Sequence, residues 1–109
     1  MTAPSLGLKG EDISAVLVIL KRYAPSAEVW AFGSRVAGKA RPFSDLDVVI
    51  IQDKPLDAHT TAELHYALSE SSLPVKVDVV EWLRASPAFQ KIILQNHVVL
   101  RSKENPTQK

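Results

Sequence analysis

Cysteine is absent from the sequence. This absence excludes disulfide bonds, thiolate zinc sites and cysteine nucleophiles. Long apolar runs are also missing, since no stretch approaches the roughly 18 residues that a membrane-spanning helix needs. The first ten residues hold no basic patch followed by an apolar segment, so we expect no signal peptide. These absences lead us to expect a cytoplasmic protein that does not enter a membrane.

An excess of charge of either sign is missing too. Lysine and arginine together number 13 and aspartate and glutamate 12, which gives a net charge of +1. This balance argues against bulk electrostatic binding to nucleic acid or to an anionic membrane, but it allows one local phosphate site. The length of 109 residues fits one domain. We expect a single domain over 1–109 with loose ends at 1–10 and 102–109.

The hydrophobic pattern predicts alternating helices and strands. The predicted helices are 11–24, a short turn at 35–39, 61–69 and one that begins at Pro87, and the predicted strands are 28–32, 46–52, 75–80 and 98–100. Thr60 and Glu63 are expected to form a capping box for the third helix, and Ser86 to cap the fourth. This order predicts an α/β (α+β) fold in which helices pack against one sheet.

Carboxylates flank the apolar strand predicted at 46–52. Asp45 and Asp47 are two residues apart and would point to the same face of a strand. Two adjacent ionised carboxylates are costly to bury unless a cation lies between them, and Mg²⁺ prefers such oxygen ligands. Asp78, in the next strand, would complete a site for two metal ions if the strands were neighbours. The sequence alone leaves that adjacency open.

A glycine–serine pair follows the first predicted strand. Gly33 allows the backbone to approach a ligand closely, and Ser34 stands where a short helix would begin and where amide N–H groups could bind phosphate. Arg35, Lys39 and Arg41 add positive charge nearby. Each feature alone is also typical of an ordinary turn or a solvated cap. Their combination is more specific, and it favours a triphosphate lying between this turn and the metal ions.

The motif Phe32-Gly33-Ser34-Arg35, followed by Gly38 and by Ser44-Asp45-Leu46-Asp47-Val48, resembles the signature of the DNA polymerase β-like nucleotidyltransferase superfamily. The small size and the amino-acid sequence from Trp30 to Arg35 resemble those of the minimal nucleotidyltransferases, called MNT. The resemblance runs from about residue 11 to residue 101 and includes the segment from Asp78 to Trp82. It implies a mixed sheet with helices packed on it.

The resemblance also implies roles for individual residues. Asp45 and Asp47 would bind metal, and Asp78 would be the third carboxylate, near the nucleophile and its proton. The nucleotide-binding residues would be Gly33, Ser34, Arg35 and Ser44.

Proteins of this kind are often encoded beside a small, all-helical HEPN protein, which they bind and adenylylate as its antitoxin. The resemblance therefore implies Mg²⁺-dependent transfer of AMP from ATP, or of another nucleoside monophosphate, to a hydroxyl of a helical HEPN-like partner. Two alternatives stay open: a small-molecule acceptor such as an aminoglycoside, and a non-catalytic module that neutralises its partner by contact. The sequence leaves the base preference open, and also the choice between homodimer and hetero-oligomer.

Overall fold

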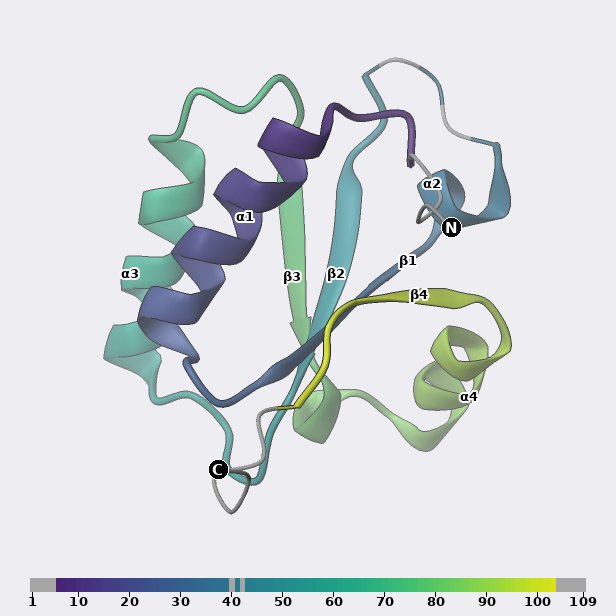
Figure 1. Cartoon of the computed structure of the whole chain (residues 1–109). Helices are drawn as coiled ribbons and strands as arrows, with labels where there is room; N and C mark the ends of the chain where they lie inside the picture. The colour runs from purple at the N-terminus through teal and green to yellow at the C-terminus, as the bar shows by residue number, and fades with distance from the viewer. Residues whose placement is uncertain (1–5, 40, 42, 104–109) are drawn as a thin grey trace, which may run out of the picture.

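A four-stranded mixed sheet organises the chain, with strand order β3-β2-β1-β4 (Figure 1). The structure is a computed structural model that describes residues 6–39, 41 and 43–103. The strands are β1 (Glu28–Phe32), β2 (Leu46–Ile51), β3 (Val77–Glu81) and β4 (His97–Arg101). β1 runs antiparallel to both β2 and β4, whereas β2 and β3 are parallel. The predicted α/β class, with helices on one mixed sheet, is confirmed.

Helices cover both faces of the sheet (Figure 1). They are α1 (Gly10–Tyr23), the short α2 (Ser34–Ala37), α3 (Ala58–Ser69), the 3₁₀ turn η1 (Trp82–Arg84) and α4 (Pro87–Gln95). α1 and α3 pack on one face against a large core, while α4 packs on the other face against a smaller one. No helix in the described part of the chain is long and apolar enough to cross a membrane.

The two faces follow from the alternation of side chains along β2. Leu46, Val48 and Ile50 point into the large core, and Val49 and Ile51 point into the small one. Burial of consecutive residues in the middle of this strand confirms that β2 is covered on both faces. Asp47, the charged residue of β2, lies near one end of the strand, where burial is incomplete.

The caps of two helices test the sequence predictions differently. Ser86 caps α4 as expected: its Oγ accepts a hydrogen bond from the Phe89 N–H at 3.1 Å, and Pro87 is the first helical residue. The capping box predicted at Thr60 and Glu63 is wrong. Asp57 caps α3 instead, and its Oδ1 accepts from the Thr60 N–H at 2.7 Å. α3 therefore begins at Ala58, three residues before the predicted start.

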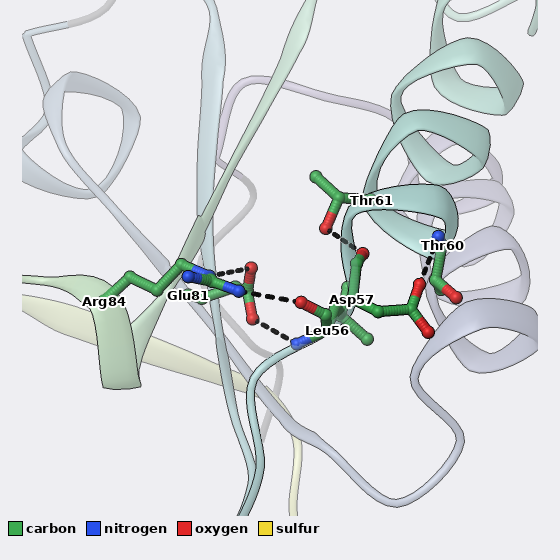
Figure 2. A network of polar contacts seen from close by, with 6 residues as sticks. All are labelled: Leu56, Asp57, Thr60, Thr61, Glu81 and Arg84. Atoms are coloured by element: carbon green, nitrogen blue, oxygen red, sulfur yellow. Dashed lines mark hydrogen bonds and ion pairs between the residues drawn. The ribbon is translucent and has the colours of Figure 1, made fainter.

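Glu81, at the end of β3, joins the sheet to the connection that leads into α3 (Figure 2). Its Oε1 accepts from the Leu56 N–H at 2.7 Å, and its Oε2 accepts from Arg84 Nε at 2.9 Å. Arg84 Nη2 donates to the Leu56 carbonyl at 2.8 Å, which closes the network. Because Asp57 directly follows Leu56, these contacts fix the start of α3 relative to β3.

Candidate active site

The parallel pairing of β2 with β3 brings the predicted carboxylates together. Asp47 and Asp78 are register partners across the two strands, and Asp45 lies just before β2. Their neighbours Leu46 and Val77 point into the large core, so these carboxylates face the opposite side of the sheet, the side of α4. The adjacency that the sequence left open is present, and the three aspartates share one end of the sheet.

The carboxylates repel one another at this end of the sheet. Burial, followed by the negative charges of Asp78 and Asp45, raises the pKa of Asp47 above its ordinary value of 3.8. No described residue forms a hydrogen bond or ion pair with any of the three carboxylates. Among the described residues, no three His, Cys, Asp or Glu side chains converge closely enough to form a ready-made metal cluster. The site is thus a set of oxygen ligands that lie at the same end of the sheet but do not converge on one point.

Gly33 lies directly against Asp47. Its φ of +84° belongs to the region that side-chain-bearing residues rarely adopt. A Cβ at this position would collide with Asp47 Oδ2 and would lie 3.2 Å from its Cγ. Ser34, the next residue, opens α2, and its hydroxyl forms no hydrogen bond with the described residues. The glycine therefore brings bare backbone directly against Asp47.

Arg35 lies away from this surface. It is buried at 5% exposure; Nε and Nη2 donate to the Ser44 carbonyl at 3.1 and 2.8 Å, and Nη1 donates to the Leu6 carbonyl at 2.9 Å. The guanidinium therefore holds the loop that leads into Asp45, a supporting role that the sequence analysis did not foresee. Burial of Leu6 also corrects the expected loose arm, since the chain is packed from this residue; residues 1–5 lie outside the described part.

Ser44, another predicted nucleotide-binding residue, forms a side-chain hydrogen bond within the turn that contains it. Its Oγ accepts a hydrogen bond from the Arg41 N–H at 2.8 Å. Of the four predicted nucleotide-binding residues, Gly33 lies against Asp47 and Ser34 follows it at the start of α2, whereas Arg35 and Ser44 form the support behind the loop. Lys39 and Arg41 have exposed side chains.

A pocket of about 300 Å³ opens between the glycine–serine turn and α4. Phe32, Phe89 and Ile92 contribute its apolar walls. A larger hollow of about 710 Å³ lies between α3 and the segment leading into β3, where Leu68, Leu73 and Val77 belong to the core on the other face. The smaller pocket is the one adjacent to the carboxylates, because Phe32 pairs with Asp47 across β1 and β2.

Comparison with known proteins now gives the class. The protein-family model described as "Polymerase beta, Nucleotidyltransferase" matches residues 15–106, a range that contains every element of the site. The chain belongs to this nucleotidyltransferase family.

Relatives within the family are more specific. A Haemophilus influenzae protein named "Probable protein adenylyltransferase MntA" is 44% identical over 104 residues, which are 95% of this chain and 91% of the relative. A solved structure described as a candidate minimal nucleotidyltransferase is 31% identical, with a TM-score of 0.63 over 81% of this chain and 88% of that one. The resemblance to minimal nucleotidyltransferases is confirmed at this level.

Toxin–antitoxin complexes share the fold. A chain of a complex described as a toxin–antitoxin with AMP-PNP has a TM-score of 0.72 at 24% identity, covering 84% of this chain and 74% of that chain. A second complex contains tri-AMPylated Shewanella oneidensis HEPN toxin with MNT antitoxin, and its matching chain has a TM-score of 0.69 at 22% identity, covering 88% and 74%. At these identities the likeness concerns the fold.

Proposed function

We propose that this chain is a Mg²⁺-dependent adenylyltransferase that moves AMP from ATP onto a hydroxyl of a helical HEPN-like protein and thereby acts as its antitoxin. The observation that carries the proposal is the juxtaposition of Asp47 with Asp78 across two parallel strands and with Gly33 across the site. The 44% identity to a protein named as a protein adenylyltransferase supports the reaction. The fold shared with antitoxin complexes, one of them containing AMP-PNP, supports the partner and the nucleotide.

The donor set fits Mg²⁺. The three carboxylates are hard oxygen ligands, they repel one another, and no described cationic side chain neutralises them. Asp45, Asp47 and Asp78 would hold the metal, and bound Mg²⁺ would supply charge neutralisation for the phosphates and the leaving group. The raised pKa of Asp47 reflects its burial first and then the negative charges of Asp78 and Asp45, and a bound cation relieves both by stabilising the ionised carboxylate.

The proposed reaction assigns simple tasks to the chain. Gly33 and Ser34 position the triphosphate, because the glycine lets phosphate oxygens approach the backbone and the serine hydroxyl can donate to them. The acceptor hydroxyl oxygen attacks the α-phosphorus of ATP. The bond from this phosphorus to the oxygen bridging to the β-phosphate breaks, and pyrophosphate leaves. The Asp78 carboxylate, which is exposed at the edge of β3, accepts the proton of the hydroxyl.

Mass spectrometry of a HEPN-like partner after incubation with this protein, ATP and Mg²⁺ tests the proposal. We expect a mass gain of one or more AMP units. Asp45→Ala and Asp47→Ala should each lower the rate by about 100-fold or more, since each removes a metal ligand. Asp53→Ala is the matched control, because this exposed aspartate follows the opposite end of β2 and should leave the rate unchanged.

Two results would contradict the proposal in different ways. A stable complex without any mass gain, in which Asp47→Ala still neutralises the partner, would leave a module that acts by contact alone. Transfer of AMP to a small molecule such as an aminoglycoside, with no modification of the protein partner, would keep the chemistry and change the acceptor.

A further inference from the structure

Phe43 is the most exposed of the large apolar residues that the structure describes. It is 86% exposed, although burial of a phenylalanine ring normally stabilises a protein. It lies in the loop between α2 and β2, at the α2 end of the sheet (Figure 1). Turn positions usually hold glycine, asparagine, aspartate or serine, because these residues suit the geometry of turns. The local backbone therefore gives no reason for a large aromatic ring at this position.

Hydrogen bonds fix the backbone on both sides of Phe43. The Ser44 N–H donates to the Arg41 carbonyl at 3.0 Å, and the Arg41 N–H donates to the Ser44 Oγ at 2.8 Å. Behind this turn, the buried Arg35 guanidinium donates twice to the Ser44 carbonyl, at 3.1 and 2.8 Å. Because the turn is already ordered, docking of another molecule on Phe43 costs little backbone entropy.

The ring lies next to the carboxylates of the candidate site. Phe43 precedes Asp45 by two residues, so their Cα atoms are at most about 7 Å apart. A surface that covers the ring therefore lies beside the carboxylates, where the acceptor hydroxyl of the proposed transfer has to lie. A second copy of this chain docked on the ring would instead cover the site.

The exposure of the ring favours a protein over the nucleotide as its contact. A site for a base is concave and covers most of the surface of its ligand. Phe43 lines neither the pocket beside the glycine–serine turn nor the larger hollow beside α3. A projecting ring instead fits an apolar depression in the surface of another protein, and aromatic residues are enriched at protein interfaces for this reason.

We propose that Phe43 is the anchor on which this chain docks the protein that accepts AMP, and that this protein has an apolar depression next to its acceptor hydroxyl. The inference rests on the proposed function, because that function supplies the acceptor. Phe43 is a positioning residue, since it adds binding energy that is the same before and during the transfer. Its loss therefore weakens the complex and raises KM, while kcat at saturating acceptor stays the same.

Equilibrium binding of the HEPN-like partner to the full chain, measured by biolayer interferometry without nucleotide, tests the inference. We expect Phe43→Ala to raise the Kd by about 30-fold, as for a residue that dominates an interface. Phe43→Leu should restore most of the affinity, because leucine also fills an apolar depression, whereas Phe43→Ser should bind as weakly as Phe43→Ala. Tyr66→Ala is the matched control, because this aromatic residue is 68% exposed on α3, on the other face of the sheet.

Transfer assays separate docking from damage to the loop. With ATP saturating, Phe43→Ala should raise the KM for the partner by about 30-fold and leave kcat unchanged. The Kd for ATP and the Tm should stay the same, because the ring is exposed in the free chain. A fall in Tm together with a loss of ATP binding would show that Phe43 maintains the loop, and the inference would be wrong.

The remaining outcomes separate the inference from the proposed function. Intact AMP transfer with a partner Kd that Phe43→Ala leaves unchanged would overturn the anchor alone. A raised Kd for ATP at unchanged partner affinity would assign the ring to the nucleotide, and a dimer of the free chain that Phe43→Ala dissociates in analytical ultracentrifugation would assign it to a second copy. A partner that binds through Phe43 but gains no AMP would overturn the proposed function and support the docking role.

Discussion

Asp47 stands at the centre of the electrostatics of the site. Its pKa is raised first by burial and then by the charges of Asp78 and Asp45. A carboxyl group with a higher pKa in the folded chain binds its proton more tightly there than in the unfolded chain. The free energy of unfolding therefore falls as the pH rises from the ordinary value of 3.8 through the folded-state pKa. At neutral pH the ionised Asp47 destabilises the free protein.

Removal of this charge should stabilise the protein while abolishing transfer. Asp47→Asn keeps the size of the side chain and removes the repulsion, so we expect Tm at pH 7 to rise by roughly 2–4 °C. The difference in Tm between Asp47→Asn and the unmodified protein should become smaller as the pH is lowered toward 4, because the Asp47 carboxyl group of the unmodified protein becomes protonated. Differential scanning calorimetry of both proteins between pH 4 and pH 7 measures it. A variant less stable than the unmodified protein at pH 7 would show that the charge is compensated in the fold.

Elements bounded by strong local signals could be predicted from the sequence. β1 has the predicted limits because an apolar run ends at a glycine, and α4 starts as predicted because Ser86 and Pro87 act together. The start of α3 was missed because Asp57 and Thr60 are both good capping residues. The choice depends on the tertiary contacts of the preceding Leu56, which local propensity does not contain. β3 likewise begins at Val77, where its pairing with β2 begins, and not at residue 75.

The candidate site, like the fold, could be predicted only in part from the sequence. The motif was enough to associate Gly33 and Ser34 with Asp45 and Asp47, whereas the adjacency of Asp78 was implied only by the family resemblance and is seen in the pairing of β2 with β3. The buried role of Arg35 was not predictable, because a basic residue beside a proposed phosphate site has the same sequence signature in either role. The pocket beside the glycine–serine turn was missed for another reason: its walls come from β1, α2 and α4, and only the packing of α4 on the sheet brings them together.

The Glu81 network should matter for stability and not for chemistry. Glu81→Ala leaves the Leu56 N–H without its acceptor and removes the partner of Arg84, so we expect a loss of about 1–3 kcal/mol in the free energy of unfolding. Glu63→Ala removes an exposed pair with His59 on α3 and should change it by less than about 0.5 kcal/mol. Urea denaturation followed by circular dichroism compares the two. Equal effects of both substitutions would refute a special role for the network.

Over the whole molecule, the two faces of the sheet are protected unequally. Among the described residues, the core beneath α1 and α3 contains most of the buried apolar side chains, whereas the core beneath α4 contains three buried ones: Phe32, Val49 and Ile93. Local opening tends to occur where little apolar surface is buried. α4, which forms a wall of the pocket, therefore belongs to the less protected half of the molecule.

Hydrogen exchange should reveal this difference. We expect the amides of α4 to exchange at least about tenfold faster than those of α1, which corresponds to a local opening that costs about 1.4 kcal/mol less. Ile93→Ala should increase exchange mainly in α4 and η1, while Leu20→Ala, at an equally buried position of α1, should increase it throughout the sheet. Uniform protection of both helices, measured by mass spectrometry of peptic fragments, would contradict this picture.

The pairing of Asp47 with Asp78 has a consequence for the order of assembly. The two residues are separated by the whole of α3, so the carboxylates come together only when β3 docks beside β2. Their repulsion therefore opposes this docking and is absent while β3 is undocked. Any ligand that brings positive charge to this end of the sheet will favour the docked strand over the undocked one. Ligand binding and completion of the sheet are thus one coupled equilibrium, and a chain interrupted before β3 lacks both.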